Sequence, residues 1–229
     1  MEEISVMEKK GFNFIDLGRI DYASALLEQH RYFDKLLKEK VERKSVCSGV
    51  LLFCEHPPVI TFGRSAKESN LLVSECLLKE KGIESFHIDR GGDVTYHGPG
   101  QITGYPIFDI EYWNIGLKEY IYRIEEVVIR FLSSYGVKGE RLDGATGVWI
   151  EPSGRSARKI CAIGVRSSRY ITMHGFALNI NTDLTYFSLI NPCGFTDKGV
   201  TSLAKELGCV VDLEKAKLQL SGLFAEVFP

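Results

Sequence analysis

Residues 90 to 101 combine groups that can hold a ligand with a backbone that a ligand can approach closely. The stretch reads Arg-Gly-Gly-Asp-Val-Thr-Tyr-His-Gly-Pro-Gly-Gln, and its glycines lack the Cβ atom that would block such an approach. Arg90, Tyr96 and His97 add a cation, a phenol and an imidazole. A β-hairpin with a Gly-Pro-Gly corner would account for the glycines but not for three polar groups beside them. The stretch therefore predicts a binding site.

A lysine stands at the start of an otherwise apolar strand in residues 159 to 165, Lys-Ile-Cys-Ala-Ile-Gly-Val. Side chains alternate between the faces of a strand, which gives two sets here: Lys159, Cys161, Ile163 and Val165 on one face, and Ile160, Ala162 and Gly164 on the other. An ammonium group is costly to bury. Lys159 is therefore either a functional residue or a residue at the start of the strand whose ammonium group is exposed to water. The sequence leaves both possibilities open.

A histidine lies in the next apolar strand, within Met-His-Gly-Phe-Ala-Leu-Asn-Ile, residues 173 to 180. Alternation predicts that His174 shares an inward face with Phe176, Leu178 and Ile180. That placement is typical of a buried core imidazole, with a catalytic role as the alternative. Gly175 and Ala177, on the opposite face, leave room for a ligand along the strand.

Cys193 stands between Pro192 and Gly194 in the segment Asn-Pro-Cys-Gly-Phe. Pro192 favours an extended conformation at the residue before it, and Gly194 permits a sharp reversal. This pattern predicts a tight turn that presents the thiol. A presented thiol without a function is open to oxidation, so the segment indicates a nucleophile; a turn without chemistry is the alternative.

The elements that must position these motifs are short strands alternating with helices. Tight turns between consecutive strands favour an α/β fold of the α+β type, with a mixed, largely antiparallel sheet and helices mostly on one face. Asp21 is expected to cap the first helix. The expected strands are 12–17, 49–54, 59–62, 86–89, 94–97, 102–110, 146–150, 159–165 and 170–180, and the expected helices are 22–40, 74–81, 117–135 and 213–228.

Length and composition fit one domain that spans residues 1–229. The net charge of −2 gives no general attraction to nucleic acid or to an anionic membrane. No apolar run approaches the roughly 18 residues that a membrane-spanning helix needs. The acidic N-terminus lacks the features of a signal or transit peptide, so a cytoplasmic location is expected.

The six cysteines, at positions 47, 54, 76, 161, 193 and 209, lack the spacing of a zinc site. In a reducing compartment they are expected to be free thiols, most of them small buried hydrophobic residues. We therefore expect no metal site and no cofactor.

Taken together, the four motifs resemble those of the lipoyl(octanoyl) transferase family, which is related to the biotin and lipoate protein ligases. The resemblance extends from about residue 53 to residue 203. The loop at residues 151 to 157 is longer and more basic than that family's pattern, which leaves the geometry just before Lys159 open.

The resemblance implies a transfer of octanoyl from acyl carrier protein to a lysine of lipoyl domains, through a thioester on Cys193 that Lys159 assists. The implied acceptors are the lipoyl domains of 2-oxoacid dehydrogenase E2 subunits and the glycine cleavage H protein. The implied substrate-binding residues come from three stretches: Arg90, Gly91, Gly92, Asp93, Val94, Thr95, Tyr96 and His97; Ala162, Ile163 and Gly164; and His174, Gly175, Phe176 and Ala177.

The chemistry of acyl transfer from a thioester to an amine suits these residue types. A nucleophilic cysteine splits the reaction into two easier steps, and a nearby ammonium can stabilise its thiolate. The base that deprotonates the incoming lysine stays open among neutral Lys159, the departing thiolate, His97 and His174. Alternation also leaves Cys161 as a rival nucleophile on the face of Lys159.

Other functions and partners are weighed on the same residues. One alternative is an ATP-dependent lipoate or biotin ligase of the same fold, which needs no nucleophilic cysteine. Another is a non-catalytic acyl-carrier-binding module, which would bind without transfer. A cysteine protease is the weakest alternative, because this chain lacks the residue order expected of one.

Between residues 152 and 182 there are basic residues but no Asp or Glu. That segment is either a docking surface for an acidic carrier protein or a strand whose counterions lie elsewhere in the fold.

Overall fold

The computed structural model describes residues 11–42, 48–191 and 198–229. Its main sheet has the strand order β1 (Asn13–Arg19), β2 (Gly49–Glu55), β6 (Gln101–Phe108), β10 (Ile171–Asn179), β9 (Arg158–Ser168), β8 (Ala145–Ile150) and β7 (Glu140–Leu142). The pairing is antiparallel from β2 to β7, while β1 joins β2 in parallel and β11 (Gly199–Val200) joins β9 in parallel. The expectation of a mixed, largely antiparallel sheet is confirmed.

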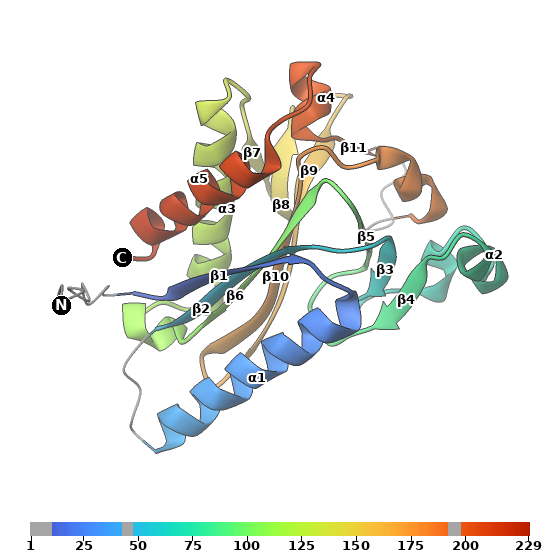
Figure 1. Ribbon diagram of the computed structural model, residues 1–229. Helices are drawn as coiled ribbons and strands as arrows, with labels where there is room; N and C mark the ends of the chain where they lie inside the picture. Colours follow the sequence, from blue (N-terminus) through green and yellow to red (C-terminus); the bar gives the residue numbers. More distant parts are fainter. Residues whose placement is uncertain (1–10, 43–47, 192–197) are drawn as a thin grey trace, which may run out of the picture.

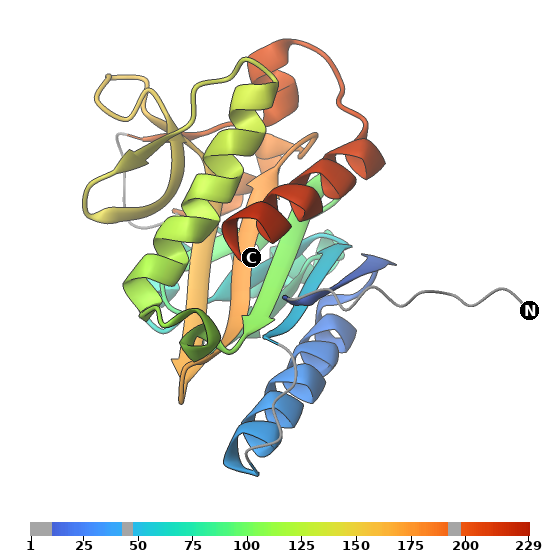
Figure 2. The ribbon, with the colours of Figure 1, turned by 90° about the vertical axis from the view of Figure 1, so that its left-hand side faces the viewer.

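Helices cover both faces of this sheet (Figures 1 and 2). The long helix α1 (Tyr22–Val41) packs on β2, β6 and β10 from one side, and α3 (Leu117–Ser134) and α5 (Leu213–Val227) pack on the other. We expected helices mostly on one face. The central strand β2 is buried at every position from Gly49 to Cys54, and a strand apolar on both sides needs cover on both faces.

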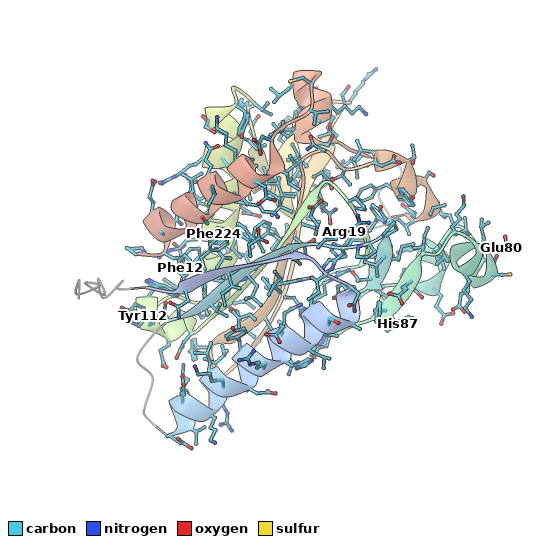
Figure 3. All side chains as sticks on the ribbon, viewed as in Figure 1. Phe12, Arg19, Glu80, His87, Tyr112 and Phe224 are labelled. Atoms are coloured by element: carbon cyan, nitrogen blue, oxygen red, sulfur yellow. The ribbon has the colours of Figure 1, made fainter. Side chains whose placement is uncertain are left out.

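The core beneath α3 and α5 is rich in aromatic rings. Phe224 of α5, labelled in Figure 3, lies among these rings. It stacks on Phe176 of β10 with ring centroids 5.6 Å apart and meets Phe53 of β2 edge-on. On the opposite face, Phe33 and Leu36 of α1 pack over β2 and β10. Both layers hold the central strands rigidly, so side chains on β9 and β10 project from a fixed frame.

A smaller sheet lies beside the N-terminal end of α1, with the order β4 (Glu84–His87), β3 (Val59–Phe62) and β5 (Val94–His97) (Figure 1). The bounds of β3 and β5 match the prediction from the sequence. The short helix α2 (Glu75–Glu80) and the 3₁₀ turns η1 (Glu68–Asn70) and η3 (Leu184–Leu189) lie with this sheet. Residues 94–97 form its strand β5, and the segment just before that strand contacts β9 of the main sheet at Gly91.

The remaining elements connect these layers. Asp21 caps α1, because its Oδ1 accepts a hydrogen bond from the Ser24 N–H at 2.8 Å, as expected. The turn η2 (Ile110–Trp113) and the helix α4 (Leu203–Leu207) were not predicted. Within the described part of the chain, no helix combines the length and the apolar character needed to cross a bilayer.

Candidate active site

A cavity of about 620 Å³ lies between the main sheet and the segment that leads into β5. Its volume is in the range of small-molecule sites. Strands β6, β9 and β10 supply one wall, and residues 90 to 97 supply another; Tyr22 of α1 and Leu117 and Ile121 of α3 contribute further lining.

The wall from the main sheet is built from small residues in register. Ala177 of β10 pairs with Ala162 of β9 and with Thr103 of β6, and Gly175 pairs with Gly164. Large side chains at these positions would fill the space above the sheet. The small ones leave a trough along the strands, as the sequence predicted for Gly175 and Ala177.

The segment after Arg90 lies directly on β9. The Gly91 N–H donates to the Val165 carbonyl at 2.9 Å, and a Cβ atom at Gly164 would lie 2.6 Å from the Gly91 carbonyl oxygen. A side chain at position 164 would therefore push the two backbones apart. The close approach that the glycines predicted is a contact between two parts of the chain, and it closes the trough at Gly164.

The structure brings nearly all of the predicted substrate-binding residues into the lining of this one cavity. The exception is Tyr96, whose ring is buried in the core of the small sheet and stacks on Tyr186 with centroids 4.8 Å apart. The predicted residues that line it are Arg90, Gly91, Gly92, Asp93, Val94, Thr95, His97, Ala162, Ile163, Gly164, His174, Gly175, Phe176 and Ala177, with Lys159 beside them.

A chain of buried hydrogen bonds holds the polar side of the cavity. Arg90 donates to the carbonyl and hydroxyl oxygens of Thr61 at 2.8 and 3.0 Å. The Thr61 hydroxyl reaches His97 Nε2 at 3.2 Å, and His97 Nδ1 lies 2.9 Å from Gln101 Oε1. Because Gln101 Nε2 donates to Asn179 Oδ1 at 2.9 Å, its Oε1 is an acceptor, which assigns the proton of His97 to Nδ1.

Three buried imidazoles near the cavity are held neutral. Burial, together with the nearby His56 and Arg90, lowers the pKa of His97 to about 3. Burial also lowers the pKa of His56 to about 4, and that of His174 to about 4 in spite of the adjacent Asp89 carboxylate. A base with so low a pKa accepts a proton poorly at neutral pH.

These imidazoles predict a loss of stability in mild acid. An unfolded histidine binds its proton near pH 6.5, whereas these three bind it only near pH 3 to 4. The stabilising contribution is complete above pH 6.5 and decreases as the pH falls, by about 2 kcal/mol per residue at pH 5. Calorimetry should give a lower Tm at pH 5 than at pH 7, and His97→Gln should reduce the difference. Equal Tm values at both pH values would contradict this account.

A β-bulge changes the faces of β9 at its start. Val148 of β8 pairs with Cys161, but the next residue, Trp149, pairs with Lys159, so Ile160 is the extra residue. A bulge inverts the alternation beyond it. Ile160 and Cys161 both lie in the core beneath α3 and α5, while Lys159 lines the cavity. The expectation that Cys161 shares the face of Lys159 is wrong.

Cys161 is unsuited to nucleophilic chemistry. Its side chain is fully buried, and burial raises the pKa of its thiol far above the ordinary range. The thiol is therefore almost entirely protonated at neutral pH.

His174 also departs from the predicted pattern. Its φ of +62° breaks the alternation of β10, and its Nε2 lies 2.9 Å from Asp89 Oδ1. Asp89 also pairs with Arg166, on the cavity side of β9. His174 is buried, as expected. Its ring, however, is turned to Asp89, and its backbone N–H donates to Gln29 of α1, so the expectation that it shares a face with Phe176, Leu178 and Ile180 is wrong.

Cys193, with Pro192 and Gly194, lies outside the described residues. The residue before them is linked to the cavity lining by hydrogen bonds, and the residues after them line the cavity. On one side the Asn191 N–H donates to the Asn70 carbonyl at 2.7 Å, and the Asn70 side chain donates to Asp93 at 2.6 Å. On the other side Lys198 and Gly199 line the cavity.

The strand after this segment is fixed to the strand that carries Lys159. In β11, Val200 pairs with Lys159, and the Thr201 N–H donates to the Lys159 carbonyl at 2.9 Å. Arg158 forms two hydrogen bonds with Glu206 of α4, at 2.7 and 2.6 Å. These contacts hold Val200 and Thr201 beside Lys159.

The basic run between residues 152 and 182 is not one continuous charged face. Arg158 pairs with Glu206 and Glu151, and Arg166 pairs with Asp89. Arg169 lies at the opposite end of the strand from Arg158, in the turn to β10. Counterions elsewhere in the fold therefore account for Arg158 and Arg166, which was the alternative interpretation of this run.

Some lining residues were not predicted. Trp149 and Tyr105 line the cavity, and both stood in predicted strands as ordinary apolar residues. Trp149 could have been found only through its pairing with Lys159, which depends on the bulge. Within the described ranges, no cluster of three or more His, Cys, Asp or Glu side chains is arranged to hold a metal ion.

Comparison with known proteins identifies the family to which this chain belongs. Residues 22–225 match the lipoyl protein ligase A/B catalytic domain. The chain is 64% identical to an octanoyltransferase of Parabacteroides distasonis over 96% of its own length and 99% of the relative's. It is 54% identical to an octanoyltransferase of Porphyromonas gingivalis, over 97% of this chain but 45% of that longer relative.

A solved structure shares the fold at low identity. The bipartite lipoate protein ligase of Thermoplasma acidophilum superposes with a TM-score of 0.67 and 15% identity, covering 95% of this chain and 84% of that one. At this identity the likeness concerns the fold alone.

Proposed function

The chain belongs to the octanoyltransferases of the lipoyl protein ligase A/B catalytic domain family, and from this premise we propose that it transfers octanoyl from acyl carrier protein to a lysine of a lipoyl domain. The reaction passes through a thioester on Cys193, with Lys159 as its partner in catalysis. The activity resides in one domain formed by the whole chain. The observation that carries the proposal is the trough of small residues that runs from Lys159 to Gly164.

The trough suits an unbranched acyl chain. Ala162 and Ala177 form one row across the sheet and Gly164 and Gly175 the next, and rows on one face are about 7 Å apart. An extended octanoyl group is about 9 Å long at about 1.25 Å per bond. Two rows therefore accommodate it, and burying its seven alkyl carbons contributes about 6 kcal/mol.

In the first step the Cys193 thiolate attacks the thioester carbonyl of the donor, and the carrier's sulfur leaves as a thiolate, which takes up a proton from solvent. A free thiol is only about 3% ionised at pH 7, and lowering its pKa to about 7 needs roughly 2 kcal/mol of charge stabilisation. A nearby ammonium can provide that amount. Lys159 supplies it in this mechanism, and backbone N–H groups bind the developing oxyanion.

In the second step the acceptor lysine, as a neutral amine, attacks the thioester on Cys193, and the cysteine leaves as a thiolate. The proton lost by the amine needs a base. His97 and His174 are poor candidates, because burial lowers the pKa of each well below neutrality. The departing thiolate and neutral Lys159 are the remaining candidates, and we assign the proton to the thiolate.

The donor and the acceptors are both proteins in this proposal. The acyl carrier protein presents its thioester at the cavity, and the lipoyl domains of 2-oxoacid dehydrogenase E2 subunits and the glycine cleavage H protein present the lysine. One cavity takes lining residues from all three implied substrate-binding stretches, which supports sequential visits of the two proteins to one site.

A chain-length prediction follows from the trough. Ala162 lines it, and a larger side chain there fills the row that the acyl chain crosses first. For Ala162→Leu we expect about a 10- to 100-fold lower kcat/KM for octanoyl carrier protein and a markedly smaller loss for butanoyl carrier protein, because the octanoyl chain must pass the blocked row to bury its remaining methylenes. A series of acyl carriers of increasing length measures this. An equal loss for every chain length would argue against the trough as the acyl site.

The choice between this activity and a ligase of the same fold depends on ATP. A ligase activates a free acid as an adenylate, whereas a transferase starts from a thioester and needs no nucleotide. Purified protein, octanoyl carrier protein and a lipoyl domain should yield octanoylated lipoyl domain without ATP and magnesium. Modification only with octanoic acid and ATP would assign a ligase, and binding without transfer would assign a carrier-binding module.

A further inference from the structure

The ammonium of Lys159 lies against the face of an aromatic ring. Its Nζ is 4.6 Å from the centre of the Trp149 ring system. The two residues are paired across the ladder of β8 and β9, and both line the cavity. Their neighbours Val148 and Ile150 lie in the core on the other face of the sheet, so the contact is built into the strand pairing.

The ring is held rigidly before any ligand arrives. Trp149 is 2% exposed, and its indole N–H donates to the Ala145 carbonyl at 3.0 Å. The strand backbone just before it is fixed by Glu125 of α3, whose Oε1 accepts a hydrogen bond from the Gly147 N–H at 3.0 Å. A Cβ at Gly147 would lie 2.4 Å from the Cys161 carbonyl oxygen, so the two strands meet closely at this point.

An indole face attracts a cation without cancelling its charge. The quadrupole of the ring favours the ammonium over the neutral amine, but the ring carries no net charge. A carboxylate in the same place would also favour the ammonium, and it would neutralise the field that a thiolate needs. The Trp149 ring therefore suits a lysine that must remain positive toward a second partner.

We propose that Trp149 is a positioning residue that keeps Lys159 protonated and fixed at the cavity throughout the reaction; this inference rests on the proposed role of Lys159. The acylated enzyme is the stage at which the ring matters most. With the sulfur neutral, a partly buried ammonium tends to lose its proton. The ring opposes that loss, so the charge is in place when the thiolate departs in the second step.

Other ionisable groups approach Lys159 from the elements around it. Cys161 of β9 interacts electrostatically both with Lys159 and with Glu125 of α3. Lys198, ahead of β11, lines the same cavity as Lys159. A nearby carboxylate favours the ammonium form of a lysine, whereas a second lysine opposes it. The test must therefore separate the effect of the ring from that of these charges, which a substitution of Trp149 alone leaves in place.

The test is the reactivity of Lys159 itself. Competitive acetylation at pH 8, with each lysine quantified by mass spectrometry, reports the neutral fraction of Lys159. In Trp149→Leu we expect this labelling to be roughly three- to tenfold faster, and in Trp149→Phe faster by a smaller factor because a weaker ring remains. We expect kcat to fall several-fold in Trp149→Leu while KM for the carrier substrate changes less than twofold.

Fluorescence provides a second measurement, which keeps Trp149 in place and so avoids a substitution that could destabilise the protein. The chain has two tryptophans, so Trp113→Phe leaves Trp149 as the single emitter. Its emission should change with pH as Lys159 ionises, and the additional change Lys159→Met should remove that transition. If Trp149→Leu lowers the Tm severely, Trp149→Phe and the fluorescence titration decide the question.

The outcomes separate this inference from the proposed function. Unchanged Lys159 labelling in both Trp149 variants, with a large kcat loss in Lys159→Ala, would overturn the role of Trp149 and leave the Cys193 mechanism standing. If Lys159→Ala turns over normally, the role of Lys159 in catalysis is wrong, and the positioning role of Trp149 is overturned with it.

Discussion

Cys193→Ala should abolish octanoyl transfer. We expect kcat to be at least about 10⁴-fold lower, because removing a nucleophile that acts together with its catalytic partners typically lowers kcat by that factor or more. The thiol carries the acyl group between the two steps of the proposed mechanism, so neither step can proceed without it. The measurement is the initial rate of octanoylation of a lipoyl domain with octanoyl carrier protein as donor.

The matched controls are the other cysteines. Cys161→Ala should keep most of the activity, because that thiol is buried in the core with a raised pKa; the loss should reflect packing alone. Cys209→Ala, at an exposed thiol, should behave like the unaltered protein. Activity lost in Cys161→Ala and retained in Cys193→Ala would reverse the assignment of the nucleophile.

Lys159→Ala is expected to lower kcat/KM about 10- to 100-fold at pH 7 and much less at pH 9. Without the ammonium, the thiol returns toward a pKa of about 8.5, and its thiolate fraction at pH 7 falls from about one half to about 3%. Raising the pH restores the thiolate directly. The pH dependence of kcat/KM from 6 to 9.5 measures both effects.

The control for Lys159 is a lysine far from the cavity. Lys138 is 83% exposed in its side chain and pairs with Glu140, so Lys138→Ala should leave the pH profile unchanged. A Lys159→Ala profile that is lowered equally at every pH would mean that Lys159 acts in some way other than stabilising the thiolate.

Much of the fold follows from local sequence patterns. The alternation and turn residues around Val59–Phe62 and Val94–His97 predict those strands to the residue. The glycines after Arg90 predict a close backbone approach, which the structure places at Gly164. The cover on both faces was missed, although the unbroken apolar run of β2 required it.

The site differs from the prediction at two points where alternation fails. The bulge at Ile160 removes Cys161 from the cavity, and the positive φ of His174 turns its ring to Asp89. Both depend on pairing with distant strands, which a local pattern does not contain. The same bulge brings Trp149 opposite Lys159, so the contact behind the further inference was equally hidden in the sequence.

The most direct test of the mechanism is the mass of the intact protein after incubation with octanoyl carrier protein and no acceptor. The account predicts the addition of one octanoyl group, mapped by peptide analysis to Cys193, removed by hydroxylamine and transferred when a lipoyl domain is added. An octanoyl group on another residue, or none at all while transfer proceeds at its normal rate, would contradict the central claim.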